Sequence, residues 1–128
     1  MTETHPVHGH HERIQAVYRY IRQNMGEPLN RDVLASVAGF SVPHFHRIFS
    51  ASAGMSIACY VRQSRLKRAG QKLRAGAVDI TEVALAAGYD THAAFSKAFK
   101  QQYDLSPSEF RQLGCRAATE LLRKDNIP

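Results

Sequence analysis

The sequence contains the same local pattern twice, and this internal repeat limits most strongly what the chain can fold into. In each copy a small residue, a glycine and an aromatic residue stand in a row, first as Ala38-Gly39-Phe40 and later as Ala87-Gly88-Tyr89. Two phenylalanines spaced by about one helical turn follow in both copies, namely Phe45 with Phe49 and Phe95 with Phe99. A pattern that recurs in this way indicates one supersecondary unit used twice.

Each copy of the repeat predicts two short helices joined by a tight turn. A glycine placed after a short apolar helix tolerates the positive φ that a helix C-terminus often needs. The phenylalanine spacing gives the second helix one apolar face. Asp79 and Glu82 can cap the helix before the second turn, and Ser106 and Glu109 form a capping box around Pro107. This arrangement is a helix-turn-helix, whose second helix usually enters the DNA major groove.

The whole pattern predicts an all-α chain of seven helices, in which a linker helix joins two helix-turn-helix subdomains. Gly70 lowers helix propensity within the linker helix, which is typical of a close helix crossing. At ~1.5 Å per residue the linker helix is close to ~30 Å long. The expected parts are a disordered tail (1–10), a first helix-turn-helix subdomain (11–55), the linker helix (56–76), a second helix-turn-helix subdomain (77–113) and a C-terminal extension or linker (114–128).

Positive charge is concentrated in the middle of the chain. Seventeen Lys and Arg residues against eleven Asp and Glu residues give a net charge of +6 and a sequence pI near 9.7. No acidic residue stands between Asp32 and Asp79, an interval that holds Arg47, Arg62, Arg65, Lys67, Arg68, Lys72 and Arg74. A basic surface of this kind suits a polyanion such as nucleic acid. The alternative is a solvated helix face with no ligand.

Several other classes of protein fit the sequence poorly. No apolar run approaches the ~20 residues of a membrane span, and the N-terminus lacks the apolar core of a signal peptide, so we expect a cytoplasmic protein. Cys59 and Cys115 make neither a disulfide framework nor a zinc site. Four histidines near the N-terminus have no Cys or carboxylate placed to complete a site: His5, His8, His10 and His11. We therefore expect no metal, no cofactor and, without a nucleophile–base spacing or phosphate-cradling glycine loop, no enzyme.

The second copy carries a motif that resembles a known family. It reads Ile80-x-Glu82-Val83-Ala84, then Gly88-Tyr89, Phe95-Ser96-Lys97-x-Phe99-Lys100 and Leu105-Ser106-Pro107-x-x-Phe110-Arg111, and the linker helix adds Arg65-Leu66-x-x-Ala69. Over about Arg13 to Leu113 the chain resembles the DNA-binding domain of AraC/XylS transcription regulators. The resemblance implies seven helices, with both recognition helices in adjacent major-groove segments of double-stranded DNA. It also implies a transcription activator that contacts RNA polymerase.

The resemblance assigns the family's base-reading positions to Pro43, His46 and Arg47 in the first copy and to His92, Ala93, Ser96 and Lys97 in the second. Arg47 is the strongest candidate, because arginine can bridge guanine O6 and N7; a phosphate contact or a solvated charge is the alternative. The second set is small or weakly specific, so we expect it to contribute more through phosphates. Candidate phosphate contacts are Ser41, Ser50, Thr91, Lys100 and Arg62.

The spacing of the two recognition helices also bears on how many chains are needed to bind one DNA site. Successive major-groove segments on one face of DNA lie ~34 Å apart, which is close to the length of the linker helix. A monomer could therefore bind an asymmetric site without a partner. The rival interpretation is a basic helical adaptor that binds acidic protein or RNA, and it predicts no preference among duplex sequences.

Overall fold

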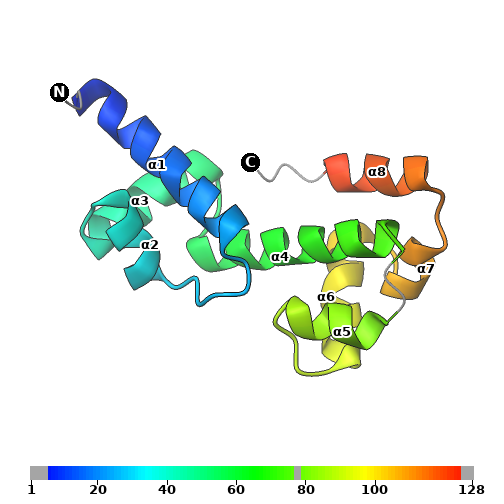
Figure 1. Ribbon diagram of the computed structural model, residues 1–128. Coiled ribbons are helices and arrows are strands. Elements are labelled where there is room, and N and C mark those ends of the chain that lie inside the picture. Colours follow the sequence, from blue (N-terminus) through cyan, green and yellow to red (C-terminus); the bar gives the residue numbers. More distant parts are fainter. Residues whose placement is uncertain (1–5, 77–78, 125–128) are drawn as a thin grey trace. The chain divides into compact units, whose positions relative to one another are not determined.

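The computed structural model describes residues 6–76 and 79–124, and helices are the only regular elements within these ranges (Figure 1). The chain divides into two compact units, of which the first reaches to Val61 and the second begins at Arg62. The predicted all-α class is confirmed. The helices are α1 (Pro6–Gln23), α2 (Arg31–Ala38), α3 (Val42–Ala53), α4 (Ile57–Arg74), α5 (Ile80–Ala86), α6 (His92–Tyr103), α7 (Pro107–Arg111) and α8 (Cys115–Lys124).

The core of the first unit forms where α1, α2 and α3 pack together with the first turn of α4. Ile14, Val17, Tyr18 and Ile21 form a buried apolar stripe on α1, and Met25, just after the helix, is buried as well. Three aromatic rings meet at the centre, with Tyr18 5.6 Å from Phe49 and 5.2 Å from Tyr60, and Phe49 5.4 Å from Tyr60. The α3 phenylalanines are therefore core residues, as their spacing predicted.

The first helix begins earlier than the sequence indicated. We expected a disordered tail up to residue 10, but α1 starts at Pro6. The part of α1 before residue 11 contacts other residues of the same unit: the His10 ring lies 5.2 Å from the Phe40 ring and 5.6 Å from the His44 ring. The Arg13 guanidinium also lies over the Phe40 ring, 5.1 Å from its centroid. His5, which belongs to the N-terminal histidine group, lies outside the described residues.

The two turns of the repeat have the same hydrogen-bonding pattern. Gly39 and Gly88 adopt φ of 75° and 93°, in the left-handed region that favours glycine. The residue after each glycine donates its backbone N–H to a carbonyl in the preceding helix, Phe40 to Ala35 and Tyr89 to Ala84, both at 3.0 Å. The extra residue of the second copy enters after this turn, before Thr91 caps α6.

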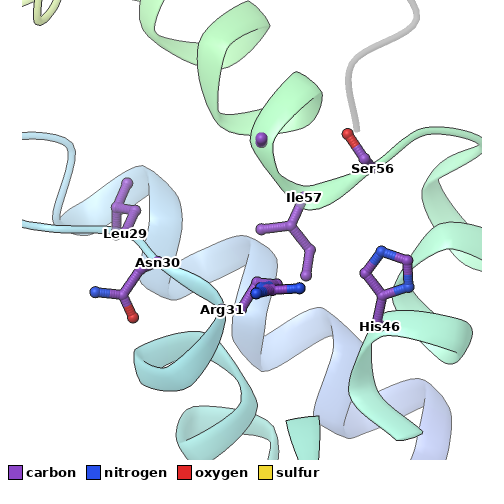
Figure 2. A pocket seen from close by; sticks show the side chains of 7 residues that line it. Leu29, Asn30, Arg31, His46, Ser56 and Ile57 are labelled. Atoms are coloured by element: carbon purple, nitrogen blue, oxygen red, sulfur yellow. The ribbon is translucent and has the colours of Figure 1, made fainter. Parts of the chain in front are cut away.

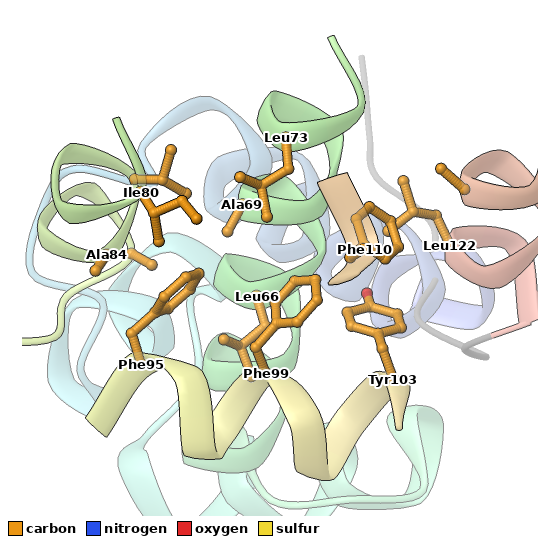
Figure 3. Packing of buried hydrophobic residues seen from close by; sticks show 13 residues of the cluster. Leu66, Ala69, Leu73, Ile80, Ala84, Phe95, Phe99, Tyr103, Phe110 and Leu122 are labelled. Atoms are coloured by element: carbon orange, nitrogen blue, oxygen red, sulfur yellow. The ribbon is translucent and has the colours of Figure 1, made fainter. Parts of the chain in front are cut away.

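The second unit is built around the α6 phenylalanines and the part of α4 that begins at Arg62 (Figure 3). Phe99 lies 4.9 Å from Tyr103 and 5.2 Å from Phe110. Leu66, Ala69 and Leu73 of α4 complete this cluster. The same kind of aromatic core therefore occurs in both units.

The predicted capping box at the start of α7 is confirmed. Ser106 N donates to Glu109 Oε1 at 2.8 Å, and Glu109 N donates to Ser106 Oγ at 3.1 Å. The hydrogen bonds from Ser106 lower the pKa of the Glu109 carboxyl, because they favour its charged form.

The C-terminal segment differs from the expectation of seven helices followed by an extension or linker. Residues Cys115–Lys124 form an eighth helix, and its Ala118 and Leu122 are buried in the core of the second unit, where Leu122 lies beside Phe110 (Figure 3). A Cβ built on Gly70 would lie only 2.6 Å from Leu122 Cδ2, so the close crossing predicted at Gly70 is confirmed, with α8 as the partner. Arg74 also donates to Thr119 Oγ1 at 3.2 Å.

Within the part of the chain that the structure describes, none of the helices combines the length and the apolar character needed to cross a membrane.

Candidate nucleic-acid interface

The outward face of α3 collects the three base-reading candidates of the first copy. Phe45 and Phe49 are fully buried, and this fixes the opposite side of the helix toward solvent. The side chains that are exposed there are Pro43, His46 and Arg47. The helix is held at its start by Ser41, whose Oγ accepts the His44 N–H at 3.4 Å. These three positions can therefore contact one ligand together.

The outward face of α6 is arranged in the same way. Phe95, Phe99 and Tyr103 are buried, while His92, Ala93 and Lys97 are exposed and Ser96 is half-buried. Thr91 caps the helix by accepting the Ala94 N–H at 3.0 Å. Ser96 Oγ lies 3.4 Å from His92 Nδ1, so the first turn of this face carries a local polar pair. Lys100 is exposed one turn beyond Lys97.

The phosphate-contact candidates differ in how accessible they are. The hydroxyls of Ser41 and Thr91 each accept a backbone N–H as helix caps, and each keeps its own O–H for donation. Lys100 and Arg62 are exposed, whereas Ser50 is half-buried and therefore less accessible. The hydroxyl caps could thus serve a helix and a ligand at once.

Two α4 arginines lie near the turn of the second helix-turn-helix. Burial raises the pKa of the Tyr89 hydroxyl, and the charges of Arg62 and Arg65 oppose that rise. The Arg65 Nη1 atom would be 3.7 Å from a Cβ built on Gly88. From the sequence, Arg65 belonged to a basic stretch that suits either a polyanion or a solvated helix face. The structure gives Arg65 a packing position beside this turn.

His44, in the first turn of α3 beside Pro43, is partly buried. His44 packs its ring 4.8 Å from Phe40 and 5.6 Å from His10. The only local sign of this contact in the sequence was the spacing of Phe40 and His44 by about one helical turn, on either side of the Ser41 cap. His44 therefore supports the start of α3, while Pro43, His46 and Arg47 remain accessible.

A pocket that the sequence did not predict adjoins the exposed face of α3. It has a volume of about 390 Å³ and lies within the first unit (Figure 2). Figure 2 shows the Arg31 side chain of α2 directed toward the side from which the His46 ring projects. Its lining comprises Leu29, Asn30, Arg31, His46, Ser56, Ile57 and Ala58. Nothing in the sequence indicated this position of Arg31, because it depends on where α2 meets α3 and α4.

Comparison with known proteins identifies the family. The family described as a helix-turn-helix domain matches residues 34–113. The regulatory protein SoxS of Escherichia coli K12 is 33% identical over 102 residues, which cover 80% of this chain and 95% of SoxS. The crystal structure of an AraC-type transcriptional regulator from Chromobacterium violaceum superposes with a TM-score of 0.75 at 27% identity, covering 80% of this chain and 92% of that one. The chain belongs to the AraC family.

A further relative agrees with this assignment, and a further solved structure shares the fold. The TetD protein of transposon Tn10 in Escherichia coli is 32% identical over 99 residues, covering 77% of the AraC-family chain described here and 72% of TetD. The fold is also that of the DNA-binding domain of AdpA, crystallised with a target DNA, with a TM-score of 0.69 at 22% identity and coverage of 88% and 96%. As a member of the AraC family, the chain is a DNA-binding regulator of transcription.

Proposed function

We propose that this AraC-family regulator recognises a specific duplex sequence by placing α3 and α6 in two adjacent major-groove segments. The observation that carries the proposal is the equivalence of the two helices. Each is capped by a hydroxyl side chain, each buries two phenylalanines, and each leaves the opposite face exposed. A helix that follows a tight turn and presents its first turns to solvent is the element that reads DNA in this motif.

The two readers have unequal roles in this proposal. On α3, Arg47 reads a guanine through paired hydrogen bonds, His46 donates to a base, and Pro43 makes an apolar contact with a thymine methyl group. On α6, Ala93 offers no hydrogen bond, so His92, Ser96 and Lys97 discriminate bases weakly. Phosphate contacts from Thr91, Lys100, Ser41, Ser50 and Arg62 set the register of the protein on DNA.

The proposal extends to how the protein acts in the cell. Two readers in one chain allow a monomer to bind an asymmetric site. The resemblance to AraC/XylS regulators favours an activator that works in the cytoplasm and contacts RNA polymerase. The net charge of +6 supports the approach to a polyanion.

The deciding experiment selects bound sequences from a random duplex pool at a stated salt concentration, first with the wild-type chain and then with Arg47→Ala. We expect a bipartite preferred sequence for the wild type. The variant should lose ~1–3 kcal/mol of binding free energy at one base pair and relax the preference there. Arg22→Ala, which removes an exposed arginine of α1, is the matched control.

The same experiment separates the rival interpretation. A basic adaptor for acidic protein or RNA would enrich no duplex sequence. An equal loss for Arg47→Ala on every duplex would instead make Arg47 a backbone contact and remove it from the base-reading set.

A further inference from the structure

We propose that the pocket beside α3 binds one phosphate group of the DNA backbone, and that Arg31 is a DNA-binding residue of this chain. The inference rests on the proposed function and names a ligand for a cavity whose lining shares only His46 with the base-reading set. Arg31 was absent from the residues that the sequence pointed to, whereas His46 was among them.

The charge and size of the pocket suit a small anion. Arg31 enters it from α2 and His46 from α3, while no acidic side chain is among the lining residues. A volume of about 390 Å³ lies near the lower end of the ~300–1,000 Å³ range of ligand pockets. The space therefore suits one compact anion better than an extended molecule.

The donors at the pocket match the chemistry of a phosphate. The planar guanidinium of Arg31 can donate two parallel N–H bonds to phosphate oxygens, and a His46 ring N–H is a second donor. Ser56 Oγ accepts the Cys59 N–H at 3.2 Å, so its own hydroxyl hydrogen can be donated. Asn30 Oδ1 accepts the Val33 N–H at 3.0 Å, and the Nδ2 amide is then the donating end of this side chain.

The place of the pocket in the fold points to DNA as the source of the phosphate. His46 lines the pocket and also stands beside Arg47 on the exposed face of α3. A backbone phosphate held between Arg31 and His46 would therefore flank the groove segment that Arg47 reads. Contacts to phosphate set the register of a protein on the duplex without reading its sequence. Arg31 should accordingly act equally on all duplexes.

The test measures how duplex affinity depends on salt for wild type, Arg31→Gln, Arg31→Lys and the control Arg22→Gln. Each duplex, the selected sequence and a scrambled one, is titrated over a range of NaCl concentrations. The slope of log K against log[salt] is negative, and losing one phosphate contact should make it shallower by about 0.9 for Arg31→Gln on both duplexes. Its Kd should rise about tenfold, while Arg31→Lys keeps the slope and Arg22→Gln keeps both values.

A second arm separates DNA from a free phosphate ligand. Inorganic phosphate is titrated into the wild-type chain while the His46 imidazole signals are followed by NMR. The proposal expects the duplex to move these signals at far lower concentration than inorganic phosphate does. Tight saturable binding of inorganic phosphate, together with an unchanged duplex slope for Arg31→Gln, would overturn it.

The outcomes also distinguish the two proposals. If Arg31→Gln keeps the wild-type slope while the wild type still selects a preferred sequence, the pocket proposal fails and the proposed function stands. If the wild type binds no duplex at all, both fail. Urea unfolding of each variant identifies one that does not fold, and in that case Arg31→Lys on its own must retain the slope for the proposal to hold.

Discussion

At the scale of single residues, the two copies differ at one position where the backbone makes the difference costly. Gly54 ends α3 in the left-handed conformation with φ of 74°, and the matching residue after α6 is Asp104 with φ of 63°. Both donate their backbone N–H to a carbonyl one turn back, Ser50 for Gly54 and Lys100 for Asp104. A side chain at such a φ is strained, although aspartate tolerates it better than most residues.

Asp104→Gly should therefore stabilise the fold by up to about 1 kcal/mol, because it removes the Cβ from a left-handed position. The midpoint of urea unfolding is the measurement. Gly54→Asp is the matched reverse change and should destabilise by a similar amount. Equal midpoints for Asp104→Gly and wild type would show that the aspartate conformation costs nothing here.

At the scale of elements, α8 is held to α4 by a contact that only a glycine permits. Leu122 is 3% exposed, and its Cδ2 atom would be 2.6 Å from a Cβ on Gly70. Glycine at position 70 lowers the helix propensity of α4, but the absence of a side chain lets α4 and α8 approach each other closely. The gain is burial of Leu122 against the core of the second unit.

Gly70→Ala should destabilise the chain by up to about 2 kcal/mol. The clash with Leu122 costs ~1–3 kcal/mol, and the improved helix propensity returns only about 1 kcal/mol. Leu122→Ala alone should cost ~2–5 kcal/mol. In the double variant, Gly70→Ala should lower the unfolding free energy by less than it does in the wild-type background. Urea unfolding of wild type, both single variants and the double variant measures this difference. Strictly additive losses would mean that the two side chains do not meet.

The capping box of α7 is the element whose stability depends on pH. The pKa of Glu109 is lowered in the folded chain, so the carboxylate stabilises α7 fully above its unfolded pKa, and this contribution is lost as pH falls through the lower, folded pKa. Unfolding free energies of wild type and Glu109→Gln, followed from pH 7 downward, should therefore converge in the acid range below about pH 4.3. A difference that stays constant with pH would exclude the charged form as the cause.

At the scale of the whole molecule, two separate aromatic cores support two similar readers. Phe49 meets Tyr18 and Tyr60 in the first unit, and Phe99 meets Tyr103 and Phe110 in the second. A change in one core acts first on the reader of that unit. Loss of DNA binding in a core variant therefore says nothing about direct contact.

Phe49→Ala should cost ~3–5 kcal/mol by leaving a cavity in the first unit. Amide hydrogen exchange should speed up in α1 to α3 and remain near wild-type rates in α6 and α7. Phe99→Ala is the matched variant, with the opposite distribution. Equal acceleration in both units for either variant would show that the chain unfolds as one cooperative block.

The sequence by itself determined the features that act over one or two helical turns. Caps such as Asp79 and Ser106 lie where the pattern predicted them, because a cap bonds to backbone two or three residues away. The buried phenylalanine faces and the glycine turns followed from spacing in the same way, whereas the family and the candidate positions Arg47 and Lys97 came from the resemblance of the motif.

Only the tertiary structure decided features that join distant parts of the chain. The burial of His44 depends on His10 and Phe40, and the docking of α8 depends on Gly70 meeting Leu122. The pocket exists because the beginnings of α2 and α4 come together beside α3. No local pattern encodes such contacts, since each requires two surfaces that are separated along the chain to fit one another.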